Sequence, residues 1–357
     1  MQNLALRGIA MWSVWQPAHR VYFNSYFLKR DGGNIVVDPL TWSPEDEQEI
    51  RERGGVAWII VTNRDHERRA RDLATLFRAK VAASELDAPL LSGPVDLMLH
   101  EGDDHFPGIH IIQLEGMKSP GEIALHLPEQ KAAIVGDALW GDPAGTVRLL
   151  PDEKLLDPRK AILSLRKLWA LRIEALLVGD GTPILHNADA IIADCLESRT
   201  DVYVNRINLD EIPEVTRSHL SPGDVPYGAT LREIGFSIGA RKLGYWVATI
   251  PPGARFCPLH GHTREEEVFY VMDGTPTIRT PRGDVQCRRG DFIAFPVGPR
   301  GAHQLLNESN APCTVFLLGA SDPNEVCFYP DSKKVMIDGL DGLILRAEPA
   351  LDYYDGE

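Results

Sequence analysis

The sequence has few features of a secreted or membrane protein. It contains five cysteines, an odd number without any CxxC pair, which argues against a disulfide framework. No stretch approaches the roughly 20 apolar residues of a membrane-spanning helix. The N-terminus also lacks the basic start and apolar run of a secretory signal. We therefore expect a cytoplasmic protein with reduced thiols and no membrane partner.

Positive charge is scarce as well, because the sequence has 37 Lys and Arg but 51 Asp and Glu, which gives a formal net charge of −14. Nucleic-acid binding needs clustered Lys and Arg, so we expect no nucleic-acid partner. Neither a GxSxG nucleophile motif nor a Walker GxxxxGK[ST] loop occurs. The 357 residues are enough for two ordinary domains, each with its own core.

The first 200 residues alternate short apolar runs with amphipathic stretches. Pro44 lies near the start of the first amphipathic stretch, where a missing N–H costs little. The expected strands contain residues 35–37, 57–61, 110–112, 123–125 and 133–135, and the expected helices span 45–53, 65–80, 157–170 and 187–198. Strands interleaved with helices predict a layered domain of both kinds of element.

From about residue 225 the helical period disappears. Short apolar runs follow at close spacing, separated by Asp273-Gly274, Arg282-Gly283 and Arg289-Gly290, which is typical of an antiparallel barrel or sandwich. The expected strands span 245–250, 268–272, 277–279, 292–295, 303–307 and 313–318. We therefore expect an α+β protein of two domains, residues 1–198 and 226–357, joined by a Pro- and Gly-containing linker at 199–225.

The strongest chemical signal lies in the second half. His260 and His262 alternate with Gly261, so on a strand both imidazoles point the same way. Glu267 begins the next apolar run, and His303 follows in a second block. Three imidazoles and one carboxylate suit Fe(II), Mn(II), Ni(II) or Zn(II), with positions left open for water or substrate. The sequence therefore predicts one divalent transition metal at this site.

The two blocks resemble the two motifs of the cupin family over residues 240–320. The HxH, Glu and Gly of the first motif match His260, His262, Glu267 and Gly274, and the second motif matches Gly290, Pro296, Gly298, His303 and Asn307. The resemblance implies a double-stranded β-helix, a jelly-roll barrel, around a mononuclear 3-His/1-Glu site. Two spacings, Gly253 to His260 and Gly298 to His303, are longer than usual, and both differences fall in turns. Inward positions predicted to line a substrate pocket are Phe256, Tyr270, Arg279, Phe295 and Gln304.

The first half resembles the metallo-β-lactamase fold over residues 10–195, which implies an αββα sandwich. Asp38, Asp65-His66, Gly136-Asp137 and Gly179-Asp180-Gly181 each follow an expected strand. The family's HxHxDH motif falls on residues 61–66, so Val61 and Asn63 replace its first two histidines. Lys118 stands at the next histidine position. The bridging aspartate and the last histidine match Asp137 and Asp180.

The family binds two metal ions, and every ligand of one of them is substituted here. The ligands of one ion have become Val61, Asn63 and Lys118, whereas the other ion's positions hold Asp65, His66, Asp137 and Asp180. Three carboxylates and one imidazole suit a hard cation, so one interpretation is a weak Mg or Mn site. The alternative is a metal-free scaffold in which Asp65 caps a helix, Asp137 binds backbone amides and Asp180 lies in a turn. Lys118 would then place its ammonium where the first ion lies in the family.

Three interpretations of function follow. The first is a cupin-type enzyme, a dioxygenase, isomerase or decarboxylase, acting on a small oxygen-chelating metabolite, with Glu267 as ligand and possible proton shuttle. The second is a non-catalytic small-molecule sensor or binding protein that uses the first domain as an interaction scaffold. The third, hydrolysis of the metallo-β-lactamase type, is disfavoured because two-metal hydrolysis needs both ions. Because an open strand edge needs covering, we also expect a homodimer.

Overall fold

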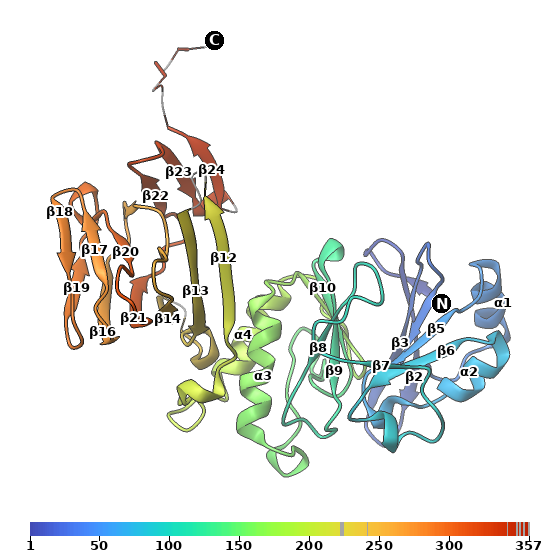
Figure 1. The fold of residues 1–357 in the computed structure, drawn as a ribbon. Helices are drawn as coiled ribbons and strands as arrows, with labels where there is room; N and C mark the ends of the chain where they lie inside the picture. The colour runs from blue at the N-terminus through green and yellow to red at the C-terminus, as the bar shows by residue number, and fades with distance from the viewer. Residues whose placement is uncertain are drawn as a thin grey trace. The chain divides into compact units, whose positions relative to one another are not determined.

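The computed structural model describes the chain except residues 222–224, 241, 341, 348, 350, 353 and 356–357. The chain divides into two compact units, residues 1–204 and 205–357, both drawn in Figure 1. The stretch 199–225, expected to be a linker, contains a 3₁₀ helix at Leu209–Glu211 and strand β12 at Val215–Ser221. Nearby Pro and Gly residues concealed this strand in the sequence.

The first unit begins with a seven-stranded sheet whose spatial order follows the chain from β1 to β7. Its strands are β1 Gln2–Asn3, β2 Ile9–Gln16, β3 Val21–Leu28, β4 Ile35–Val37, β5 Trp58–Val61, β6 Lys80–Ser84 and β7 Leu97–Leu99. Helices α1 (Pro44–Glu52) and α2 (Ala70–Phe77) cover one face through Ile50 and Leu73. Helix α1 starts at Pro44, one residue before the expected span of 45–53, and Ser43 caps it.

A second sheet, in the order β11-β10-β9-β8, lies against the other face of the first. Its strands are β8 His110–Gln113, β9 Ile123–Leu127, β10 Ala132–Val135 and β11 Ala175–Val178. Helices α3 (Pro158–Ala170) and α4 (Ala188–Glu197) cover its outer face through Leu165 and Ile192. These four layers confirm the expected αββα sandwich (Figure 1).

The predicted helix at 65–80 is wrong in extent. A 3₁₀ helix spans Arg64–His66, the chain then turns at Arg68, and α2 occupies only Ala70–Phe77 before β6 begins at Lys80. Arg68 has a φ of 41°, in the left-handed region that a non-glycine residue seldom adopts. The turn aims the Arg68 side chain into the unit, where it contacts Asp180. Among the helices that the structure describes, none is both long and apolar enough to cross a membrane.

The second unit consists almost entirely of strands. Its largest sheet has the order β12-β13-β14-β21-β16-β19, and two smaller sheets have the orders β15-β22-β23-β24 and β18-β17-β20. The core between them includes Phe269, Ile278, Leu305 and Val315. Strand bounds are β13 Val225–Glu233, β14 Leu243–Ile250, β15 Gly261–His262, β16 Glu267–Asp273, β17 Thr277–Thr280, β18 Gly283–Gln286, β19 Phe292–Phe295, β20 Gln304–Leu306, β21 Cys313–Ala320, β22 Val326–Tyr329, β23 Lys334–Ile337 and β24 Leu343–Arg346. The expected barrel strands are all present, and they form the predicted cupin architecture.

Candidate functional site

Backbone pairing brings the two histidine blocks of the second unit together. His260 and His303 form an antiparallel bridge, in which the amide of each residue donates to the carbonyl of the other at 3.1 and 2.7 Å. The amide of Gly298 donates to the carbonyl of His262 at 2.6 Å. The extra residues between Gly298 and His303 form a 3₁₀ turn at Pro299–Gly301, so the longer spacing is absorbed without moving His303 away.

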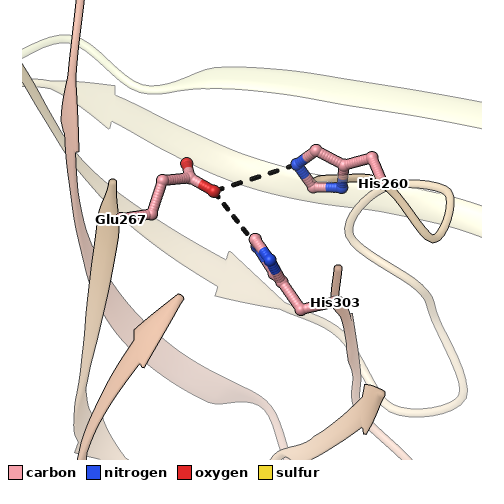
Figure 2. Close-up of side chains that lie close together, drawn as sticks. All are labelled: His260, Glu267 and His303. Carbon is pink, nitrogen blue, oxygen red and sulfur yellow. Dashed lines mark ion pairs between the residues drawn. The ribbon is translucent and has the colours of Figure 1, made fainter. Parts of the chain in front are cut away.

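Three of the four predicted metal ligands, the histidines, converge on one carboxylate oxygen of the fourth, Glu267. Glu267 Oε2 lies 3.2 Å from Nε2 of His262, 3.2 Å from Nε2 of His303 and 3.9 Å from Nε2 of His260. Figure 2 shows His260 and His303 approaching Glu267 from different segments. Ligand atoms of His260, Glu267 and His303 all lie within 4.8 Å of one another.

The ring nitrogens away from Glu267 fix the tautomers of two histidines. His260 Nδ1 lies 3.0 Å from the carbonyl of Pro258, and His303 Nδ1 lies 2.9 Å from the carbonyl of Gly301. Since a carbonyl only accepts, each Nδ1 carries the proton and each Nε2 offers a lone pair. This is the arrangement of a histidine that is ready to bind a metal through Nε2.

The donor set fits a transition metal. Nε2 of His262, Nε2 of His303 and Oε2 of Glu267 are buried and have no hydrogen-bond partner among the described residues. Buried polar atoms in native structures nearly always have partners. One divalent cation bound by these atoms and by His260 would satisfy all of them, with the imidazole and carboxylate ligands that Fe, Mn, Ni and Zn accept.

The electrostatics keep His260 and Glu267 in their ligating forms. Burial and the nearby His303 lower the pKa of His260 to about 4, so its ring is neutral at pH 7. Burial would raise the pKa of Glu267, but its contacts with His262 and His303 outweigh burial and hold the pKa well below its usual range. Glu267 is therefore a carboxylate and His260 a neutral imidazole.

Glu325, which no sequence motif indicated, lies behind His262. Its side chain is 1% exposed and accepts hydrogen bonds from the amides of Thr263 (2.7 Å), Arg264 (2.7 Å) and Glu265 (3.1 Å). Its Oε1 also lies 3.5 Å from Nδ1 of His262, the ring nitrogen that faces away from Glu267. Nδ1 of His262 makes no hydrogen bond among the described residues, so Glu325 acts on His262 through the 263–265 loop that it holds. Glu325 lies just before β22, far from both motifs, so no spacing signal marks it.

Of the five residues predicted to line a substrate pocket, Phe295 lies at the metal site, where its ring stacks on that of His303. Phe256 lines a separate pocket of about 660 Å³ in the second unit. Tyr270 faces away from the metal ligands and lines an apolar pocket beside Phe316. The period of a strand explains this difference, because Glu267 and Tyr270 are three residues apart on β16 and so point to opposite faces.

The other two predicted pocket residues form a polar wall next to the pocket of Phe256. Arg279 makes a two-pronged ion pair with Asp331, with distances of 2.6 and 3.1 Å. Gln304 accepts a hydrogen bond from Arg279 at 3.2 Å and donates to the carbonyl of Cys257 at 2.7 Å. Asp331 and Cys257 both line that pocket. These two side chains are committed to protein contacts.

Three of the four residues predicted for a metal site in the first unit come together. Nε2 of His66 lies 3.4 Å from Asp137 Oδ1 and 3.9 Å from Asp180 Oδ2, and all three side chains are buried. Asp65 is not part of this cluster: its side chain is 41% exposed and pairs with Lys118 at 2.7 Å. Asp65 does not cap the helix either. Asn63 does, by accepting from the amides of Asp65 and His66.

Two basic side chains accompany this cluster. Arg68 Nη2 lies 2.7 Å from Asp180 Oδ1, and Lys118 Nζ lies 3.4 Å from Asp137 Oδ2. Asp137 and Asp180 thus contact cationic side chains, whereas the metal-free alternative placed them on backbone amides and in a turn. With Val61 apolar and Asn63 used as a cap, the residues do not fit the two-metal centre that the fold family implies.

His66 is the centre of the cluster. Its Nδ1 lies 2.7 Å from Asp38 Oδ2. Burial and Arg68 lower the pKa of His66, but the carboxylates of Asp38 and Asp137 outweigh them and raise it to about 10. Two glycines make room for the cluster: a Cβ on Gly179 would lie 2.6 Å from His66 Cε1, and one on Gly136 would lie 2.3 Å from Thr62 Oγ1.

Comparison with known families agrees with both units. Residues 1–198 match the family model described as "Metallo-beta-lactamase superfamily", and residues 246–319 match that of the "Cupin domain". The chain therefore belongs to the metallo-beta-lactamase superfamily and carries a cupin domain in its second unit. No curated protein matches the chain in sequence.

Several solved structures are similar to one unit or the other. A putative sugar phosphate isomerase from Acidithiobacillus ferrooxidans is 23% identical, covering 43% of this chain and 98% of its own, with a TM-score of 0.38. A metallo-beta-lactamase family protein from Thermus thermophilus is 19% identical over 55% of this chain and 79% of its own, with a TM-score of 0.43. The metallo-beta-lactamase FIM-1 from Pseudomonas aeruginosa is 15% identical over 56% and 94%, with a TM-score of 0.45. These likenesses are too distant to assign an activity to the chain.

Proposed function

We propose that the cupin unit is a metal-dependent enzyme acting on a small polar metabolite that chelates through its oxygens. His260, His262, Glu267 and His303 would hold one Fe, Mn, Ni or Zn ion. One observation carries this proposal: three buried ligand atoms have no hydrogen-bond partner among the described residues. They are Nε2 of His262, Nε2 of His303 and Oε2 of Glu267, and each Nε2 lies 3.2 Å from that Oε2.

The arrangement supports a substrate site as well as a structural ion. The side chains of His260, His262 and Glu267 are 14%, 13% and 18% exposed, so one side of the cluster is open, whereas His303 is fully buried. When bound, the metal would supply a Lewis acid or an oxygen-activating centre. Dicarbonyl, hydroxy-acid and catechol-like groups match a site with two adjacent open positions. Dioxygenase, isomerase and decarboxylase chemistry all use such substrates.

Within this proposal the protein's own side chains and backbone hold the histidine ligands in place. Stacking on Phe295 and the carbonyl of Gly301 hold the His303 ring, and Glu325 holds the loop that carries His262. Glu267, kept ionised by its histidine neighbours, serves in this proposal as a metal ligand, because its lowered pKa makes it a weak proton acceptor. Hydrolysis of the metallo-β-lactamase type is not proposed, because the first unit's residues do not fit a two-metal centre.

The first experiment is metal analysis of protein purified without a His-tag or chelator. We expect about one equivalent of metal, lost in His260→Ala/His262→Ala. The matched control is His100→Ala/His105→Ala, which removes two half-exposed histidines of the first unit and should retain the metal. A metal-free wild type, or loss of metal in the control alone, would contradict the proposal.

Catalysis is then tested separately from binding. The metal-loaded protein is offered dicarbonyl, hydroxy-acid and catechol compounds, while oxygen consumption and product formation are followed. Turnover that disappears in His260→Ala/His262→Ala supports an enzyme. A compound that raises the unfolding temperature without being converted supports the second interpretation, a small-molecule sensor or binding protein.

A further inference from the structure

We propose that Arg68 and Lys118 act as built-in replacements for metal ions in the first unit. On this proposal His66, Asp137 and Asp180 form a latent divalent-cation site that the Arg68 guanidinium occupies. The inference depends only on the first unit and is independent of the function proposed for the cupin unit.

The cluster needs positive charge from some source. Asp38, Asp137 and Asp180 are 1%, 6% and 2% exposed, so three carboxylates are buried close together around His66. Burying carboxylates is costly unless cations or hydrogen-bond donors compensate for the lost water. In a metalloprotein the ion provides this compensation. Here His66 and the donors of Thr62 compensate Asp38, while Arg68 compensates Asp180 and Lys118 compensates Asp137.

Arg68 is fixed in this position by contacts on all sides. Nη2 lies 2.7 Å from Asp180 Oδ1, Nη1 donates to the carbonyl of Asn24 at 3.0 Å, and the guanidinium lies 4.8 Å from the ring centre of Phe23. The side chain is only 9% exposed. The left-handed backbone at Arg68 is the local distortion that aims it inward. The guanidinium is therefore a packed part of the interior.

The guanidinium lies beside the atoms that would bind a metal ion. Nη2 lies 3.1 Å from Nε2 of His66 and 2.7 Å from Oδ1 of Asp180, and Oδ2 of Asp180 lies 3.9 Å from the same Nε2. Metal–nitrogen and metal–oxygen bonds are about 2.0–2.2 Å long. An ion bound to both His66 and Asp180 would lie close to the Arg68 guanidinium and be repelled by its charge, so the metal and Arg68 compete for the cluster.

Lys118 compensates the solvent-facing side. Its Nζ lies 2.7 Å from Asp65 Oδ2 and 3.4 Å from Asp137 Oδ2, and the side chain is 38% exposed. The Lys118 ammonium thus pairs with Asp65, which lies outside the cluster, and with Asp137, which belongs to it. Arg68 thus compensates the buried side of the cluster, and Lys118 compensates the solvent-facing side.

Removing Arg68 should open the latent site. One imidazole and two carboxylates with room for water suit Mn(II) or Zn(II). The test uses the full chain with the cupin ligands removed by His260→Ala/His262→Ala, so that any metal bound belongs to the first unit. Into this background go Arg68→Ala and the control Arg69→Ala, which removes a 55% exposed neighbour paired with Asp72.

Mn(II) binding is measured by equilibrium dialysis, and thermal unfolding is followed with and without Mn(II). We expect the background and Arg69→Ala to bind no Mn(II) above the level of bovine serum albumin, and their unfolding to be unchanged by the ion. Arg68→Ala should unfold at a lower temperature, bind about one equivalent and regain stability with Mn(II).

Two results would overturn the proposal. One is a background protein that already binds an equivalent of Mn(II) which Asp137→Asn removes, because the wild-type cluster would then be an ordinary metal site. The other is an Arg68→Ala variant that neither binds Mn(II) nor is stabilised by it. If Arg68→Ala does not fold in metal-free buffer, the proposal requires Mn(II) in the refolding buffer to restore it, and failure in both buffers refutes it.

Discussion

The ring of Phe295 stacks face to face on the imidazole of His303, with ring centroids 3.6 Å apart and an angle of 17° between their planes. His303 is fully buried, and its Nδ1 is fixed by the carbonyl of Gly301. The stacked ring therefore removes the remaining rotation of an imidazole whose Nε2 must point at Glu267. The apolar ring of Phe295 thus sets the orientation of the His303 imidazole.

Replacing this aromatic ring tests its role. Phe295→Ala should destabilise the cupin unit by about 3–5 kcal/mol, because it leaves a cavity in the core, and should weaken metal binding by freeing His303. Urea unfolding and metal titration measure the two effects. The control is Phe292→Ala on the same strand, where the ring is 74% exposed. Equal losses in the two variants would show that Phe295 has no special relation to His303.

Glu325 offers a second test of positioning. In Glu325→Gln the amide group faces three backbone N–H donors and can no longer compensate for them as a carboxylate does. We expect metal affinity to fall about 10–100-fold, as for other carboxylates that support a metal-binding histidine. Competition with a chelating dye measures it, and exposed Glu308→Gln is the control. Unchanged affinity would reduce Glu325 to a clamp for the 263–265 loop.

Metal removal should affect the two units differently. A chelator should lower the unfolding temperature of the cupin unit, since a ligand at about 1,000 times its Kd contributes about 4 kcal/mol to stability. The first unit should unfold at the same temperature with and without the chelator, because Arg68 and Lys118 remain in place. Calorimetry on wild type and His303→Ala resolves the two transitions. A chelator-sensitive first unit would contradict the replacement of metal by side chains.

The cysteines should be poor nucleophiles. Burial raises the pKa of all five thiols, Cys195, Cys257, Cys287, Cys313 and Cys327. A higher pKa leaves less thiolate at pH 8, and the thiolate is the reactive form. A thiol reagent at pH 8 should therefore modify the native protein slowly and all five thiols rapidly in denaturant. Fast reaction of one thiol in the native state would contradict its burial.

The sequence predicted that the four candidate cupin ligands lie together, because motif spacing fixes which strand faces share a carboxylate. His260, His262 and Glu267 lie within eight residues, and His303 follows at the start of the strand that pairs back. The prediction that Tyr270 lines the substrate pocket beside the metal ligands was wrong. Residues two apart on a strand share a face, and Tyr270 is three residues from Glu267, so its ring lies on the opposite face of β16.

Arg68 and Glu325 could not be predicted in the same way. Arg68 is one of several charges between Asp65 and Asp72, a pattern typical of a solvated helix face, and only the left-handed turn redirects it toward Asp180. Glu325 contacts its loop across about 60 residues of chain, a distance over which no periodicity acts. Both are tertiary contacts, so local pattern carries no information about them.

The glycines around His66 have a consequence for how this sequence can drift. A Cβ at Gly136 would meet Thr62 Oγ1 at 2.3 Å and Asn63 Nδ2 at 2.5 Å, and one at Gly179 would meet the His66 imidazole, so neither position admits a larger residue while these side chains stay. Lys118 and Asp65, 38% and 41% exposed, are under no such steric limit. Homologous chains should therefore vary freely at the surface pair yet retain both glycines.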